Sequence, residues 1–390
     1  MNDFVFHSPT EFIFGRGVEA QAGERIAHCG GHRVLIVCGG GSAQRSGLLD
    51  RVVKALDSAG LAHSLLEGVR PNPTDEKVRE GIRIGRTEGT DWLLAIGGGS
   101  VIDTAKAIAA GLRYAGDFWD FFDGTATVTE ALPIGVVLTI PAAGSEGSGN
   151  SVITKTATRQ KISLRTPYAL RPKFALLNPE LTLTLPAWQT ACGITDMLAH
   201  IMERYFTNTP ATVVTDHISE GLMRAIVEEA RHVILNPQDY DARANLMWAG
   251  TLAHNGLCGT GCEEDWASHF MEHEVSAFYD VSHGAGLAVI FPAWLQWMAA
   301  HHATKVAQWA ERVWDVGPSG TPQATAEEGI RRFRAFLASI GMPLTLRELG
   351  IEHPDINELV DSLHRNKGEF IGNYVRLTRK DTEEIYRLAQ

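Results

Sequence analysis

Short apolar runs alternate with helix-like segments in the first half of the chain. The runs predict strands at residues 34–38, 62–66, 92–96, 133–140, 151–154, 161–164 and 174–177. Amphipathic segments before and between the first three of these runs predict helices at about 18–27, 48–58 and 75–88. Continuous apolar strands that alternate with helices are typical of a parallel sheet covered on both faces. The pattern predicts a doubly wound, Rossmann-like α/β domain.

The N-terminus and the second half carry different patterns. Residues 4–6 and 11–14 are strand-like and flank Ser-Pro-Thr, which predicts a hairpin. After Pro186 the chain changes to long segments of helical period with almost no strand candidates. We therefore expect an α/β dinucleotide-binding domain over residues 1–186 and an all-helical domain over 187–390.

Composition narrows the class of protein. The 390 residues contain 35 Lys and Arg against 46 Asp and Glu, a net charge of −11, and 44% are hydrophobic. Such a chain can bury a core, but it lacks the basic excess that nucleic-acid binding needs. The longest apolar stretch, 285–300, is interrupted by Pro292 and Gln296 and is shorter than the about 18 residues of a membrane span. No nucleic-acid partner and no membrane segment are expected.

The start of the chain and the cysteines bear on the compartment. The first residues lack the basic and apolar regions of a secretory signal. Five cysteines are an odd and sparse set, which favours a reducing, cytoplasmic setting over disulfides. Cys258 and Cys262 are a weaker candidate for a small metal or redox pair, because no second pair lies nearby.

Two glycine-rich turns follow two of the predicted strands. Gly39-Gly40-Gly41-Ser42 and Gly97-Gly98-Gly99-Ser100 each lie between a strand and a helix. Glycines there let the backbone approach a pyrophosphate closely, and the helix N-terminus offers unpaired N–H groups. An alternative is a tight turn without a ligand, in which Ser100 caps the helix and Asp103 completes a capping box. Because the turn is repeated, and 141–147 adds a third, the pattern favours dinucleotide binding at one sheet edge.

The helical half carries candidate metal ligands. Asp196 and His200 are four residues apart, as are His269 and His273, so each pair shares a helix face, and His283 follows. A carboxylate with three imidazoles suits Fe²⁺ or Zn²⁺ with one position open to substrate. A histidine hydrogen-bonded within the core is the alternative for any one of them. Spacing alone does not select four ligands among these groups.

The motifs together resemble a known family. Gly97-Gly-Gly-Ser-Val-Ile-Asp-Thr-Ala-Lys106, Gly193-x-x-Asp196-x-x-x-His200-x-x-Glu203 and Asp265-Trp-Ala-Ser-His269-x-x-x-His273, with His283-Gly284, are similar to the iron-containing (group III) alcohol dehydrogenases. The similarity extends along essentially the whole chain and is greatest to the butanol dehydrogenase and NADPH-dependent aldehyde reductase branch. The resemblance implies a dehydroquinate synthase-like arrangement, with the active site in a cleft between the two domains, and a homodimer.

The resemblance also implies roles for individual residues. It assigns the metal to Asp196, His200, His269 and His283, and it places His273 near substrate and nicotinamide. The implied cofactor residues are Gly39, Gly40, Gly41, Ser42, Arg45, Asn72, Gly97, Gly98, Gly99, Ser100, Asp103, Thr139, Ala142, Ser145, Lys161, Thr182 and Leu185. Six aromatic residues are weaker candidates for a substrate pocket: Trp119, Phe121, Phe122, Trp248, Trp266 and Tyr279.

One position departs from the NAD-preferring members of the family. Gly41 stands where those members carry an aspartate, which accepts the ribose 2′-hydroxyl and repels a 2′-phosphate. Glycine leaves room, and Ser42 and Arg45 supply donors. We therefore expect NADP(H) as the preferred cofactor, with NAD(H) as the alternative.

These expectations define a reaction. It is reversible hydride transfer between nicotinamide C4 and a short-chain aldehyde or primary alcohol, with His273, water and the ribose hydroxyls as the proton route. A metal-dependent lyase or hydrolase on the same two-domain scaffold and a non-catalytic nucleotide or metal sensor are the competing readings. A lyase of the dehydroquinate synthase type needs a lysine- and arginine-rich pocket, and the stretch from Gly193 to His283 is poor in lysine.

Overall fold

The structure is a computed structural model that describes residues 1–317 and 320–390. The chain forms two compact units, His7–Leu185 and Pro186–Gln390, and the second unit also includes Met1–Phe6. We call them the sheet unit and the helical unit.

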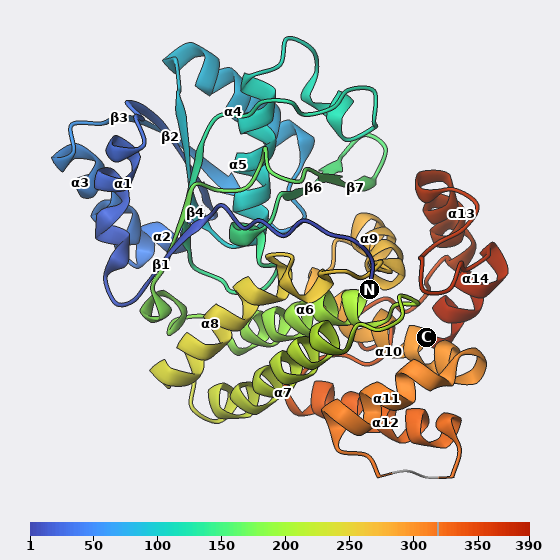
Figure 1. The fold of residues 1–390 in the computed structure, drawn as a ribbon. Coiled ribbons are helices and arrows are strands. Elements are labelled where there is room, and N and C mark those ends of the chain that lie inside the picture. The colour runs from blue at the N-terminus through green and yellow to red at the C-terminus, as the bar shows by residue number, and fades with distance from the viewer. Residues whose placement is uncertain (318–319) are drawn as a thin grey trace. The chain divides into compact units, whose positions relative to one another are not determined.

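Six parallel strands form the sheet of the sheet unit, in the order β1-β8-β5-β4-β2-β3 (Figure 1). They are β1 (Glu11–Phe14), β2 (Arg33–Gly39), β3 (Ala62–Val69), β4 (Trp92–Gly97), β5 (Ile134–Leu138) and β8 (Phe174–Leu177). Strands β4, β5 and β8 are buried along their whole length, as continuous apolar runs predict. The expected parallel α/β sheet is confirmed.

Helices cover both faces of this sheet. Helices α1 (Ala22–His28) and α3 (Leu48–Ser58) pack with β2 and β4 into one apolar core. Helices α4 (Asp75–Glu88) and α5 (Gly99–Leu112) lie on the other side of the sheet from these two (Figure 1). They approach closely, since a Cβ at Gly81 of α4 would lie 2.2 Å from Ile108 of α5. The sheet is therefore doubly wound.

The strand order reverses between β2 and β4. The chain passes from β2 outward to β3 and then returns to β4 on the other side of β2. In the register of this pair Cys38 lies beside Ile96, so both strands end at the same edge. Ligands of open α/β sheets bind at this kind of switch point.

A separate antiparallel hairpin follows β5. It consists of β6 (Asn150–Lys155) and β7 (Gln160–Arg165), and its backbone contacts the segment before α4 through Thr154 N and Pro73 O, 2.8 Å apart. The predicted short strands at these positions therefore exist, but they pair with each other and lie outside the parallel sheet.

The expected N-terminal hairpin is wrong. Strand β1 pairs in parallel with β8, and residues 4–6 are exposed and have no strand structure. Asn2 N donates instead to Gly261 O of the helical unit at 2.9 Å. Alternating apolar residues indicated a strand, but this segment finds its hydrogen-bond partners far along the sequence.

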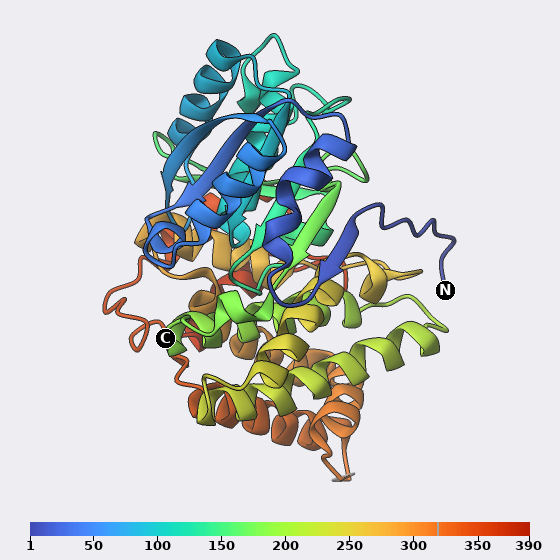
Figure 2. The same cartoon turned by 90° about the vertical axis from the view of Figure 1, so that its left-hand side faces the viewer.

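The helical unit is built from α6 (Ala187–Tyr205), α7 (Val213–Leu235), α8 (Tyr240–His254), α9 (Ala267–Tyr279), α10 (His283–His301), α11 (Ala303–Trp314), α12 (Pro322–Ser339), α13 (Ile356–Lys367) and α14 (Arg379–Leu388) (Figures 1 and 2). Helix α10 is buried over almost its entire length, because it is apolar on all sides and other helices surround it. The 285–300 stretch is thus a core helix. Within the described residues, none of the helices combines the length and apolar character needed to cross a membrane.

Candidate metal and cofactor sites

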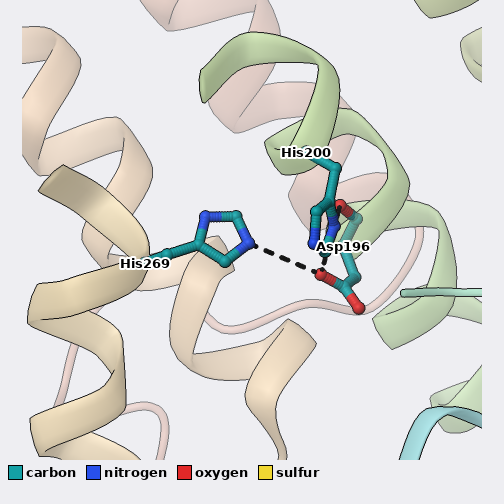
Figure 3. A group of neighbouring side chains, drawn as sticks. All are labelled: Asp196, His200 and His269. Atoms are coloured by element: carbon teal, nitrogen blue, oxygen red, sulfur yellow. Dashed lines mark hydrogen bonds and ion pairs between the residues drawn. The ribbon is translucent and has the colours of Figure 1, made fainter. Parts of the chain in front are cut away.

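Helix α6 places Asp196 and His200 on one buried face. The two residues are separated by one helical turn, and each is 5% exposed. His200 Nδ1 lies 2.8 Å from the backbone oxygen of Asp196 and 3.0 Å from Asp196 Oδ1. Figure 3 shows both side chains pointing toward His269 of α9.

The ligands on α9 and α10 converge on the same carboxylate. His269 Nε2 and His283 Nε2 each lie 3.8 Å from Asp196 Oδ1. The ring centroids of His269 and His200 are 4.6 Å apart, and those of His269 and His283 are 5.4 Å apart. Ligand atoms from Asp196, His200 and His269 lie within 4.8 Å of one another. The structure therefore brings together the four residues that the family resemblance selected.

The donor set fits a divalent ion. Ligand atoms of a tetrahedral ion with bonds of about 2.1 Å are about 3.4 Å apart, close to the 3.8 Å found here. Asp196 Oδ1 and His269 Nε2 are buried without a hydrogen-bond partner. Two buried polar atoms facing one point without partners are expected where an ion binds.

The pKa shifts of Asp196 and His200 favour the protonation states of metal ligands, whereas that of His269 favours its protonated form in the metal-free protein. Burial opposes ionisation of Asp196, but His200, His269 and His283 hold the pKa of its carboxyl well below the ordinary value. Burial lowers the pKa of His200, although Asp196 opposes that change. Burial also acts to lower the pKa of His269, but Asp196 and Glu203 more than offset it and the pKa is raised. The anionic carboxylate is the state that a metal ligand requires.

Two buried glutamates contact the ligand imidazoles. Glu203 Oε1 lies 2.8 Å from Nδ1 of His269, and Glu272 Oε2 accepts from Nδ1 of His283. Both hydrogen bonds are made by the ring nitrogen opposite to the one that faces Asp196. Glu203 belongs to a motif noted in the sequence, but no role was predicted for Glu203 or for Glu272. Their signal was spacing, because Glu203 follows His200 by three residues and Glu272 follows His269 by three.

His273 lies beside the cluster. It is 5% exposed, and its ring centroid is 5.5 Å from that of His283 and 6.5 Å from that of His269. Glu272, His273 and His283 form a second group of nearby potential ligands. Since Glu272 already accepts hydrogen bonds from His283 and Ser276, we interpret this group as the surroundings of the first site.

The two glycine loops lie at neighbouring strand ends of the sheet unit. Gly39 ends β2, and Gly41 precedes α2 (Ser42–Arg45) with φ 99°. Gly97 ends β4, and Gly98 is the N-cap of α5. A Cβ at Gly97 would lie 2.5 Å from Val101, and one at Gly98 would lie 2.9 Å from Ile140. The backbone thus comes closer to its surroundings here than a side chain would permit.

The capping-box alternative is wrong. Helix α5 begins at Gly99, no side chain caps it, and Ser100 is already inside the helix. The carboxylate of Asp103 accepts instead from Ser145 Oγ at 2.6 Å and from Val152 N at 2.9 Å. The N–H groups at the start of α5 therefore have no side-chain acceptor of their own.

A buried lysine connects α5 to the segment that carries Ser145. Lys106 is fully buried, and its Nζ donates to the backbone oxygens of Ser145, Ser148 and Asn150 at 2.7–2.9 Å and to Ser145 Oγ at 2.8 Å. Burial lowers its pKa to about 8, against the opposing effect of Asp103. Lys106 was quoted in the glycine motif without a role; its position three residues after Asp103 was the available signal.

The remaining cofactor candidates also belong to the sheet unit. Lys161 Nζ of β7 donates to Asn72 Oδ1 at 3.0 Å, and Asn72 has a positive φ of 52°. Thr139 N donates to Gly97 O at 3.0 Å, which joins the third turn to the second glycine loop. Thr182 is buried and donates to Pro179 O, and Leu185 N donates to Thr182 O. Ala142 lies in the half-buried turn after β5.

The weaker candidates, six aromatic residues and two cysteines, do not lie in one place. Trp266 lies with the metal ligands, 5.1 Å from His269 and 5.9 Å from His200 between ring centroids. Trp119, Phe121 and Phe122 are buried in the sheet unit, Trp248 is 40% exposed, and the Tyr279 hydroxyl accepts from Asp355 N. The thiols of Cys258 and Cys262 contact different backbone oxygens, and neither belongs to a metal-ligand group among the described residues.

Two family models together match most of the chain. Residues 9–179 match the family described as iron-containing alcohol dehydrogenase, and residues 190–390 match the C-terminal part of the Fe-containing alcohol dehydrogenase family. The chain belongs to the iron-containing alcohol dehydrogenase family and is an oxidoreductase that uses a divalent metal and a nicotinamide cofactor.

Individual relatives carry related names. The chain is 39% identical over 390 residues, all of both chains, to the probable NADH-dependent butanol dehydrogenase 1 of Bacillus subtilis. It is 35% identical over 393 residues, again all of both, to the NADPH-dependent aldehyde reductase YqhD of Escherichia coli. The solved structure of NADH-dependent butanol dehydrogenase A from Thermotoga maritima superposes with a TM-score of 0.96 at 39% identity, covering 100% of this chain and 99% of that one. These relatives confirm the dehydrogenase interpretation and do not favour a lyase, hydrolase or sensor.

Proposed function

We propose that the protein is an NADP(H)-preferring alcohol dehydrogenase and aldehyde reductase that interconverts short-chain aldehydes and primary alcohols. The observation that carries the proposal is the convergence of three imidazoles on Asp196 in a chain similar over its full length to named butanol dehydrogenases and an aldehyde reductase.

Asp196, His200, His269 and His283 hold the metal in this proposal, and Fe²⁺ and Zn²⁺ both suit the set. A bound ion of this kind supplies Lewis-acid polarisation of a carbonyl group. The four side chains come from three helices whose contacts are buried, so the donor atoms are held in place before the ion binds. Trp266 packs edge-on against the rings of His200 and His269.

The cofactor phosphates bind the two glycine loops at the β2 and β4 strand ends in this proposal. The start of α5 offers backbone N–H groups without a capping side chain, and helix N-termini favour anions. Ser145, which Lys106 and Asp103 fix from two sides, lies on the nicotinamide side together with Thr139 and Ala142. Lys161, Asn72, Thr182 and Leu185 complete the cofactor site.

Preference for NADP(H) is supported by the surroundings of Gly41. A Cβ at this position would lie 3.1 Å from Arg45 Nη1, so the guanidinium group lies beside Gly41. Glycine has no carboxylate that could pair with this guanidinium or repel a phosphate. With φ 99°, the backbone also disfavours any side chain at this position. Arg45 and Ser42 are the donors that we assign to a 2′-phosphate.

His273 is the proposed proton-handling residue. It lies beside His283 and outside the four-ligand set, and an imidazole near neutral pH is suited to exchange a proton with substrate or ribose. The expected result for His273→Asn is a lower kcat with aldehyde at unchanged bound metal. An unchanged kcat would remove His273 from the mechanism.

The metal assignment is tested with Asp196→Ala. NADPH oxidation by butanal, followed at 340 nm, should be abolished while NADPH still binds, because the cofactor residues belong to the sheet unit. Chelation of the unsubstituted protein should have the same effect, and adding back Fe²⁺ or Zn²⁺ in parallel identifies the metal that supports turnover. Turnover that persists in Asp196→Ala would refute the assignment.

Cofactor preference is tested with Arg45→Ala. Loss of a charged hydrogen bond to the 2′-phosphate, about 1.5–3 kcal/mol, should lower kcat/KM for NADPH about 10- to 100-fold and leave NADH unchanged. Arg25→Ala, which removes a half-buried arginine of the same unit paired with Glu11, is the matched control. An equal loss for both cofactors would contradict the 2′-phosphate role.

We further propose that the protein acts in the cytoplasm as a homodimer. The five cysteines are free thiols, which suits a reducing compartment. Light scattering on the purified protein tests the dimer, for which the support is family membership alone.

A further inference from the structure

Glu203 accepts hydrogen bonds both from backbone N–H groups and from a metal-ligand side chain. Its Oε1 accepts from His269 N at 2.9 Å and from the His269 ring at 2.8 Å, and its Oε2 accepts from Trp266 N at 2.6 Å. The two backbone N–H groups belong to Trp266, the N-cap of α9, and to His269 in its first turn. One carboxylate on α6, 1% exposed, therefore satisfies the start of α9 and fixes a metal ligand on it.

Glu272 accepts hydrogen bonds from side chains of two helices. It is fully buried on α9 and accepts from the His283 ring through Oε2 and from the Ser276 hydroxyl through Oε1. Its position is tightly confined, because a Cβ at Gly286 would lie 2.5 Å from Oε1. The carboxylate therefore connects α9 to the ligand at the start of α10.

We propose that Glu203 and Glu272 are positioning residues that set the metal affinity, and that Glu203 also couples this affinity to the fold of α9. Each carboxylate accepts the Nδ1 hydrogen of one ligand imidazole, which leaves its Nε2 lone pair directed at Asp196. In glutamine the amide nitrogen replaces one acceptor oxygen. At position 203 it would face an N–H donor, and at 272 a ring nitrogen or a hydroxyl.

The experiment compares three isosteric substitutions. Glu203→Gln and Glu272→Gln are compared with Glu274→Gln, a buried glutamate of the same helix that accepts instead from Asn366 at 3.0 Å. The binding of Zn²⁺ to metal-free protein is measured by chelator competition, and thermal unfolding of the metal-free protein is followed by circular dichroism.

The first two variants should weaken Zn²⁺ binding about 10- to 100-fold. Glu274→Gln should leave Zn²⁺ binding unchanged. The unfolding temperature of the metal-free protein should fall further for Glu203→Gln than for Glu272→Gln, because Glu203 accepts from two backbone N–H groups at the start of α9.

Unchanged Zn²⁺ affinity in either folded variant would overturn the inference, as would an equal loss in Glu274→Gln. If Glu203→Gln does not fold, Glu272→Gln decides, and its failure to fold would also contradict the role given to it here. The inference rests on the proposed ligand set. Failure of the unsubstituted protein to bind Zn²⁺ would refute that set, whereas binding that is insensitive to both glutamates would refute only this inference.

Discussion

At Gly284 the helix that carries His283 comes close to the backbone of the helix that carries Asp196. A Cβ at this position would lie 2.2 Å from the backbone oxygen of Cys192 and 2.7 Å from its carbonyl carbon. Ordinary contact begins at about 3.4 Å, so Gly284→Ala requires the starts of α6 and α10 to separate by about 1.2 Å. The clash is with backbone atoms, so no side-chain rotation can relieve it.

The displacement is large on the scale of metal coordination. Gly284 adjoins His283, and Cys192 precedes Asp196 by one helical turn, while metal–ligand distances tolerate about 0.2 Å. We expect Gly284→Ala to lose Zn²⁺ affinity by more than tenfold. The strain of about 1–3 kcal/mol should also lower the unfolding temperature of the metal-free protein by several degrees.

The assay is Zn²⁺ competition together with thermal unfolding. Gly221→Ala is the control, because Gly221 lies within α7 and a Cβ there would meet nothing within 4 Å. That variant should be more stable by about 0.5–1 kcal/mol, as expected for alanine in a helix. If Gly284→Ala binds Zn²⁺ as tightly as the unsubstituted protein, the four-ligand site does not depend on this contact and the reasoning fails.

Two further predictions concern the sheet unit. Lys106→Met should destabilise the protein by about 3–5 kcal/mol and raise KM for the cofactor, because three backbone oxygens lose a donor and the buried Asp103 loses a neighbouring positive charge. Chemical denaturation measures this, and an effect no larger than that of the exposed Lys54→Met would contradict the buried network. Burial, with the charge of Glu67, raises the pKa of Cys38 to about 11, so about one thiol in a thousand is ionised at pH 8. Iodoacetamide should therefore modify the exposed Cys29 well before Cys38 in the folded protein, as peptide mass spectrometry would show, and equal rates would refute the difference.

The sequence predicted the elements whose periodicity is strong. Strands such as β4 and helices such as α3 and α4 lie where the apolar pattern placed them, because burial on both faces of a parallel sheet leaves a continuous apolar run. The pattern failed at residues 4–6, which form no strand, while the neighbouring Met1 and Asn2 donate to residues more than 200 positions away. No local rule contains such a contact.

Part of the candidate site also follows from local sequence spacing, and part does not. Helical spacing brought Asp196 together with His200, but the choice of His283 over His273 came from family resemblance, since both are near His269. The roles of Glu203, Glu272 and Lys106 depend on contacts between different helices or between a helix and a loop, and these contacts exist only in the folded chain.

The hydrogen bond between Asn2 and Gly261 has a consequence for synthesis on the ribosome. The first residues emerge first but pair with a segment translated about 260 residues later, a delay of roughly 10 to 50 seconds at ordinary elongation rates. The sheet unit can fold during this interval, while the apolar residues Phe4, Val5 and Phe6 remain outside it. N-terminal residues of a nascent chain are accessible to chaperones and proteases until they find their partners. Mutations that slow the folding of residues 209–261 should therefore lengthen the time for which Phe4, Val5 and Phe6 stay accessible.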